Sequence, residues 1–66
     1  MTITLNGSRH EIADGTTLHQ LVADFSLPER GVALAMNGEV VPRSVWASTQ
    51  VLPDARVEVV TASQGG

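Results

Sequence analysis

Two Asn-Gly dipeptides, Asn6-Gly7 and Asn37-Gly38, constrain the fold of this 66-residue chain more than any other feature. Both residues of an Asn-Gly pair tolerate positive φ, which the tight turn of a two-residue β-hairpin requires. A run of alternating apolar and polar residues, or of large and small ones, precedes each dipeptide, and this period of two is typical of strands. The chain is therefore predicted to form two hairpins and one last strand. The predicted strands are 1–6, 8–13, 32–36, 40–41 and 57–60.

One main helix is predicted between the two hairpins. Thr17 is a suitable N-cap, and Gln20, three residues later, completes a capping box. The residues that follow place apolar side chains at i, i+3, i+4 and i+7, which gives one apolar stripe over about two and a half turns. Pro28 limits the extent of the helix. The stripe consists of Leu18, Leu21, Val22 and Phe25.

A short helical turn is predicted between the second hairpin and the last strand. Pro42 ends the preceding strand because proline has no N–H for the ladder, and Ser44 is expected to cap a single turn that carries Trp46. As the only tryptophan of the chain, Trp46 is expected to cover the edge of the core.

The order of these elements predicts an α+β fold, with one helix packed on one face of a mixed sheet of four to five strands. The last strand is expected to pair beside the first and to fill the centre of the sheet, which is a β-grasp layout. Residues 1–60 are expected to form this domain, and residues 61–66 to form a flexible tail that ends in two glycines.

Composition excludes several classes of function. The net charge is −3, and the four arginines are scattered among seven acids with no lysine, which argues against nucleic-acid binding. No cysteine is present to form a disulfide, act as a nucleophile or bind zinc. His10 and His19 are isolated in the sequence, so no metal site is predicted. With no apolar run of membrane-spanning length and no signal peptide, the chain is predicted to be a cytoplasmic protein, without membrane contact and monomeric when free.

Several short motifs along the chain occur together in one known family. They are Asn-Gly-Glu-Val-Val-Pro-Arg at 37–43, Trp46, Val-Glu-Val-Val at 57–60 and the terminal Gly65-Gly66, with Asn6-Gly7 and Asp-Gly-Thr-Thr-Leu at 14–18 in the first half. On these motifs the whole chain resembles the ubiquitin-like sulfur carriers of prokaryotic cofactor synthesis, and within that group the thiamine-biosynthesis sulfur carriers. One departure is the turn before the last strand, where such carriers usually have Gly-Asp and this chain has Asp54-Ala55. Alanine disfavours positive φ, which leaves the type of this turn open.

The resemblance implies that the chain is a protein substrate and carrier, not an enzyme. Joining the Gly66 carboxylate to AMP would make it electrophilic, and a sulfur nucleophile could then displace AMP and leave a terminal thiocarboxylate. The slim tail formed by Ser63, Gln64 and Gly65 would enter the active site of a partner. The chain itself would bind no cofactor, since ATP and magnesium would be used by the partner.

The partners that the resemblance implies are an adenylyltransferase of the ubiquitin-activating type, thiazole synthase as sulfur acceptor, and a cysteine desulfurase or other persulfide as sulfur donor. The sheet face away from the helix is the candidate docking surface. Its predicted members are Ala33, Ala35 and Val60, with Arg43 at the rim.

Three alternative functions remain compatible with the same residues. The small subunit of molybdopterin synthase shares the fold, the tail and the chemistry of the thiamine carriers. A ubiquitin-like protein modifier would instead be joined through Gly66 to lysines of its targets. A plain β-grasp interaction module would make no use of the terminal glycines.

Overall fold

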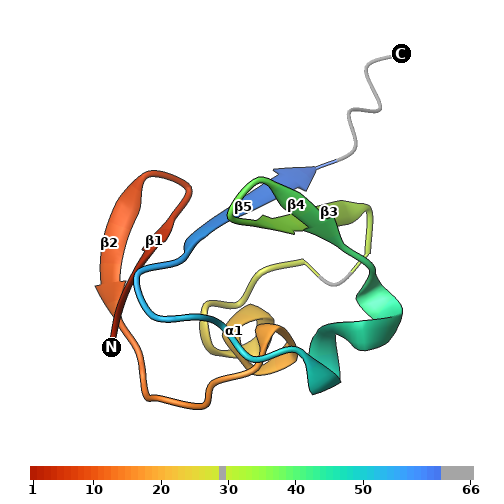
Figure 1. The fold of residues 1–66 in the computed structure, drawn as a ribbon. Helices are drawn as coiled ribbons and strands as arrows, with labels where there is room; N and C mark the ends of the chain where they lie inside the picture. Colours follow the sequence, from red (N-terminus) through yellow and green to blue (C-terminus); the bar gives the residue numbers. More distant parts are fainter. Residues whose placement is uncertain (29, 62–66) are drawn as a thin grey trace.

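The structure is a computed structural model that describes residues 1–28 and 30–61 (Figure 1). Five strands, one α-helix and one 3-10 helix follow one another along the chain. In order they are β1 (Thr2–Leu5), β2 (Ser8–Glu11), α1 (Leu18–Asp24), β3 (Val32–Met36), β4 (Glu39–Val41), η1 (Arg43–Ser48) and β5 (Arg56–Thr61).

The five strands form one mixed sheet in the order β2-β1-β5-β3-β4. β1 and β5 are parallel to each other, whereas the other three strand pairs are antiparallel. Helix α1 connects the two hairpins and covers one face of the sheet (Figure 1). The predicted β-grasp arrangement is confirmed, including the central position of the last strand. β5 is one residue longer at each end than predicted, since it begins at Arg56 and ends at Thr61. Thr61 was predicted to begin the tail, but it pairs with Val32 of β3.

Both Asn-Gly dipeptides form the predicted hairpin turns. The φ angles are 49° and 84° at Asn6 and Gly7, and 52° and 86° at Asn37 and Gly38. The residues that flank each dipeptide are direct cross-strand partners, so each loop has two residues. Positive φ at both loop positions is the signature of type I′, whose twist matches that of the flanking strands.

Helix α1 begins with the predicted capping box. The Thr17 hydroxyl accepts the backbone N–H of Gln20 at 3.1 Å, and the Gln20 side chain accepts the backbone N–H of Thr17 at 3.2 Å. The helix is shorter than its apolar stripe predicted, since it ends at Asp24 and Phe25 is the C-cap.

A left-handed residue ends helix α1 before Pro28 is reached. Ser26 has a φ of 53°, and the N–H of Leu27 donates to the carbonyl of Val22 at 2.9 Å. The N–H of Ser26 also donates to the carbonyl of Ala23 at 3.2 Å. These two bonds form a Schellman motif, in which glycine usually occupies the position of Ser26.

The hydrophobic core lies between the sheet and the two helices. Trp46 of η1 was predicted to cover the edge of the core, and it is in fact a fully buried member of it, at 1% exposed. Its indole N–H is not left unpaired, because it donates to the carbonyl of Val41 at 2.8 Å. The buried apolar residues are Ile3, Leu5, Leu18, Leu21, Val22, Leu34, Trp46, Val51, Ala55 and Val57.

The cap predicted for the short helical turn is wrong. η1 begins at Arg43, one residue before Ser44, and its N-cap is Pro42, which makes no side-chain capping bond. The fixed φ of proline, −60° here, suits the extended residue that precedes a helix, so the helix starts without a hydroxyl cap.

The turn before β5 places its left-handed residue at Asp54, which has a φ of 60°. The N–H of Ala55 donates to the carbonyl of Leu52 at 3.1 Å, so the turn spans Leu52 to Ala55 with Pro53 and Asp54 at its centre. Proline followed by a residue with positive φ is the pattern of a type II turn. Ala55 avoids positive φ and is buried instead.

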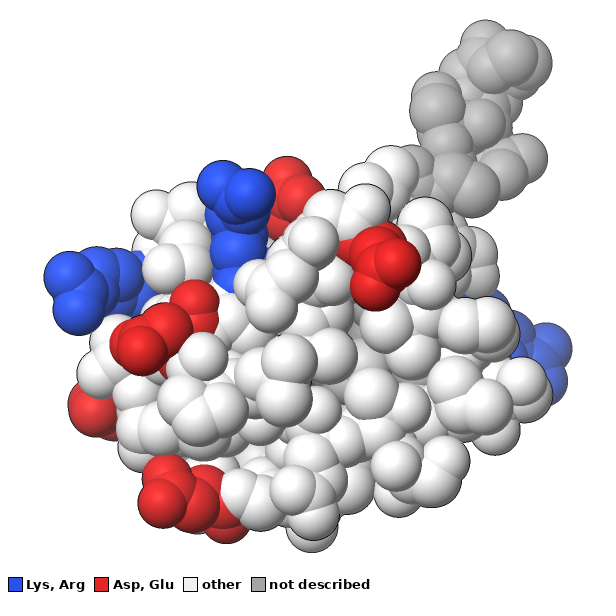
Figure 2. All heavy atoms as spheres, viewed as in Figure 1, with Lys and Arg blue, Asp and Glu red and all other residues white. Residues whose placement is uncertain are grey.

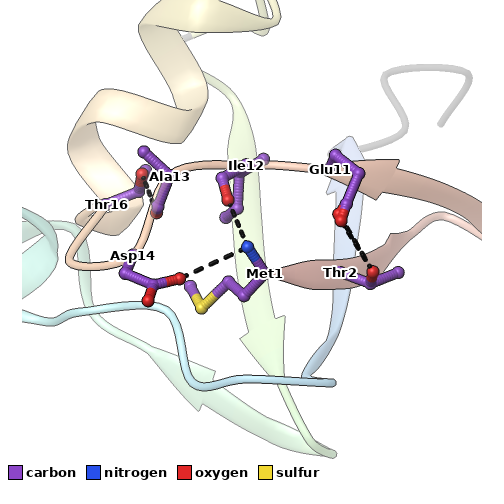
Figure 3. Close-up of polar contacts among 7 residues, drawn as sticks. All are labelled: Met1, Thr2, Glu11, Ile12, Ala13, Asp14 and Thr16. Atoms are coloured by element: carbon purple, nitrogen blue, oxygen red, sulfur yellow. Dashed lines mark hydrogen bonds and ion pairs between the residues drawn. The ribbon is translucent and has the colours of Figure 1, made fainter.

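The first residues of the chain are tied to the segment after β2 (Figure 3). The amino group of Met1 donates to the carbonyl of Ile12 at 2.7 Å and lies 3.3 Å from the carboxylate of the exposed Asp14. The N–H of Ile12 donates in return to the carbonyl of Met1 at 2.8 Å. The β1–β2 pairing therefore extends beyond the two strands at this end.

Candidate docking face and C-terminal tail

The predicted reactive end of the chain lies outside the described residues. This applies to Gly66 and to the three tail residues Ser63, Gln64 and Gly65. The structure describes the strand that leads to them. β5 is the central strand of the sheet, and its last residue, Thr61, is paired with Val32 of β3. The last described residue of the chain is therefore held in the sheet by β3.

The predicted docking residues Ala33, Ala35 and Val60 lie on the sheet face away from the core. Ala33 and Val60 are direct cross-strand partners, and Val60 is 60% exposed. The alternation predicted for β5 is confirmed, because Val57 is buried and Val59 packs against the core, whereas Val60 points outward.

Val40 belongs to the same surface and was not predicted. It is the cross-strand partner of Ala35 and is 70% exposed. The two-residue loop at Asn37-Gly38 could have revealed this contact, since it pairs residues 36 with 39 and 35 with 40. We refer to Ala33, Ala35, Val40 and Val60 as the apolar patch.

Arg43 was predicted at the rim of this surface, but the strand register does not bring it into the patch. It is the first residue of η1, two positions after β4 ends at Val41, and its side chain is exposed. Arg43 makes an interaction of its own in the fold.

The other half of the open face, over β1 and β2, carries polar and charged side chains. Thr4 lies between Arg9 and Arg56 in the strand register, and both arginines are exposed. The Thr2 hydroxyl donates to the carboxylate of Glu11 at 3.0 Å (Figure 3). The apolar patch lies over β3, β4 and the end of β5, and it is bordered by the exposed Glu58, the cross-strand partner of Ala35.

Charged side chains are also unevenly distributed on the side of the molecule seen in Figure 2. Most of them lie toward the upper and left-hand parts of this view, with one basic side chain at its right-hand edge, whereas its centre carries uncharged surface.

The described residues form no pocket and include no group of three acidic, histidine or cysteine side chains able to hold a metal ion. His10 packs its ring edge-on against Phe25, with ring centroids 4.8 Å apart, and His19 is exposed on α1. Neither histidine therefore belongs to a metal-binding group among the described residues. Within residues 1–28 and 30–61, neither helix has the length and apolar character needed to cross a bilayer.

Comparison with known families bears directly on the predicted resemblance. The model of the ThiS family matches residues 3–66, which is nearly the whole chain. The chain belongs to the ThiS family. The sulfur carrier protein ThiS of Escherichia coli (strain K12) is 32% identical over 66 residues, and the match covers all of both chains.

Solved structures of ThiS proteins share the fold. The crystal structure of a thiamine biosynthesis protein (ThiS) from Geobacter metallireducens is 26% identical, with a TM-score of 0.88 over the full length of both chains. A thiazole synthase from Magnetococcus marinus is 35% identical to this ThiS-family chain over 66 residues, but there the chain spans only 20% of the relative's length. That synthase therefore contains a segment similar to the whole of this chain.

Proposed function

We propose that this protein is a sulfur carrier of thiamine biosynthesis, whose Gly66 carboxylate is adenylated and then converted to a thiocarboxylate. The observation that carries the proposal is the end-to-end similarity to a sulfur carrier protein, with 66 residues matched and no part of either chain left over. The fold supports the proposal, because the central strand β5 leads directly to the terminal residues.

The proposed chemistry explains why a carrier of this kind needs partner enzymes. A carboxylate is a poor electrophile, because resonance and negative charge both oppose attack by a nucleophile. In the proposed reaction the Gly66 carboxylate attacks the α-phosphorus of ATP, which releases pyrophosphate and forms an acyl-adenylate. The terminal sulfur of a partner's persulfide then displaces AMP and forms an acyl disulfide. A partner thiol attacks the partner-side sulfur of this S–S bond, so the partner sulfurs end as a disulfide and the thiocarboxylate is released. The resulting thiocarboxylate is anionic and nucleophilic, so it can transfer sulfur to a carbon electrophile.

Three partners complete this proposal. An adenylyltransferase of the ubiquitin-activating type would supply the ATP and magnesium site, and a cysteine desulfurase or other persulfide would supply sulfur. Thiazole synthase would accept the sulfur, and the ThiS-like segment within the Magnetococcus marinus thiazole synthase supports this pairing. The chain itself acts as a substrate and carrier, and it would meet these enzymes in the cytoplasm.

The apolar patch is the proposed docking surface for the adenylyltransferase. Inserting residues 62–66 into an active site orders that segment, which costs conformational entropy. Contacts made by the folded domain must offset this cost. The patch is suited to this role because Val40 and Val60 expose large apolar side chains on either side of two flat alanines, next to the start of the tail. Five extended residues span at most about 17 Å, enough to reach a buried site while the domain stays outside.

Mass spectrometry of the intact protein tests the proposed function. Incubation with the adenylyltransferase of its own cell and ATP should add AMP at the C-terminus, and further incubation with the sulfur donor should replace one oxygen by sulfur. A thiocarboxylate that supports thiazole formation by thiazole synthase, and not molybdopterin formation, would assign the pathway. Isopeptide-linked target proteins, or a chain that is never adenylated, would overturn the proposal.

A further inference from the structure

The side chain of Asn6 continues the parallel ladder between β1 and β5 after β1 has ended. The regular pairing of these strands stops at Leu5 and Val57. The N–H of Asn6 then donates to the carbonyl of Val57 at 2.9 Å, and its side-chain Oδ1 accepts the N–H of Val59 at 2.8 Å. The side-chain carbonyl thus supplies the acceptor that the next peptide group of a longer β1 would have supplied.

Asparagine can both adopt the backbone conformation of the turn and form a side-chain hydrogen bond to β5. At a φ of 49° the backbone of Asn6 has left the extended conformation and turns toward β2. Asparagine and aspartate tolerate this left-handed region better than other residues with a side chain. Glycine would tolerate this positive φ equally well, but it has no side-chain carbonyl to accept the N–H of Val59.

Asn37 makes the equivalent pair of bonds at the other end of β5. Its N–H donates to the carbonyl of Arg56 at 2.8 Å, and its Oδ1 accepts the N–H of Arg56 at 2.9 Å. The two type I′ turns therefore hold the same central strand, Asn37 at its first residue and Asn6 close to its last. Only the bond made by Asn6 lies near the tail.

We propose that Asn6 is a positioning residue for the C-terminal tail, a role that rests on the proposed function. Val59 is held on the β1 side by Asn6, and only Val60 and Thr61 separate it from residue 62. Among the described residues, no strand pairs with β5 on this side beyond Val57, whereas β3 pairs with it on the other side as far as Thr61. The Asn6 bond therefore fixes the end of β5, from which the tail continues, and with it the orientation of Val60 in the apolar patch.

Without this bond, the end of β5 would be held by β3 alone and could rotate relative to the rest of the sheet. The apolar patch and the end of β5 would then no longer be presented to a partner in one arrangement. The partner would have to order an additional segment, which reduces productive binding of the tail.

Hydrogen exchange of individual amides, measured by NMR on the whole chain, tests the structural part of the proposal. Asn6→Gly removes the side-chain carbonyl and keeps a residue that accepts positive φ, and Asn37→Gly is the matched control. In Asn6→Gly the Val59 amide should exchange roughly threefold to tenfold faster, as expected for loss of one hydrogen bond. In Asn37→Gly the Arg56 amide should lose protection, and the Val59 amide should keep it.

Adenylation by the cognate adenylyltransferase tests the positioning role. We expect kcat/KM to fall about threefold to tenfold in Asn6→Gly, to stay near the parent value in Asn37→Gly, and to recover in Asn6→Asp, which restores an acceptor oxygen. Unchanged exchange at Val59 in Asn6→Gly, or equal loss of kcat/KM in both glycine variants, would overturn the positioning role. Failure of the proposed function is distinct, because the parent chain itself would then not be adenylated.

Discussion

The indole N–H of Trp46 donates a hydrogen bond of 2.8 Å to the backbone carbonyl of Val41, and this bond ties helix η1 to the end of strand β4. Trp46 is also 1% exposed and contributes the largest fully buried side chain of the core. One residue therefore links the segment between β4 and β5 to the sheet through both packing and a polar contact.

Replacing this tryptophan should destabilise the whole domain. In Trp46→Phe the ring becomes smaller and the Val41 carbonyl loses its donor, so we expect the free energy of unfolding to fall by about 2 kcal/mol. Urea unfolding followed by circular dichroism measures this change. Val40→Ala, at an exposed position of β4, should change stability by less than about 0.5 kcal/mol. Equal effects of the two substitutions would contradict the role assigned to Trp46.

Ser26→Gly should stabilise the protein by about 0.5–1 kcal/mol. The φ of 53° at this C-terminal position of α1 is strained for serine and unstrained for glycine. Thermal and urea unfolding of the purified variant measure the gain. Ser44→Gly, in η1 and without positive φ, serves as control and should be neutral or destabilising. A loss of stability in Ser26→Gly would show that the serine side chain outweighs the backbone strain.

Val60→Asp should leave the fold intact and slow adenylation. Val60 is 60% exposed, so the free energy of unfolding should change little, whereas a carboxylate in the apolar patch would be desolvated on docking. We expect kcat/KM for adenylation to fall by about tenfold or more. Val45→Asp, at a 39% exposed position of η1 outside the apolar patch, is the control and should react like the parent. Unchanged kinetics in Val60→Asp would rule out the apolar patch as the docking surface.

Gly66→Ala should abolish or cripple adenylation with no effect on the fold. A methyl group on the last residue would widen a tail that has to enter a narrow site and would displace the reacting carboxylate, and misplacement of this kind can cost about a hundredfold in rate. The formation of acyl-adenylate is followed by mass spectrometry, with Ala62→Ser as a control at the start of the tail. Adenylation of Gly66→Ala at the parent rate would contradict the narrow-site argument.

Local elements could be predicted from the sequence because their signals lie within a few residues of one another. The Asn-Gly turns depend on two residues that accept positive φ, and the capping box on Thr17 and Gln20. The ends of the helices were predicted less well. Ser26 carries no conformational signal of its own, and its left-handed conformation results from the Schellman bonds that Leu27 and Ser26 make to α1. Pro42 begins η1 without the side-chain cap for which Ser44 was chosen.

The sequence by itself determined the β-grasp order of the elements, the family motifs and the slim glycine ending, because each depends on neighbouring residues or on their order. Only the tertiary structure decided which distant residues meet. Val60 faces Ala33, and Asn6 holds Val59, which lies 53 positions further along the chain. Such contacts follow from the register of strands that pack on one common core, and a shift of one residue would turn every side chain of a strand to the other face.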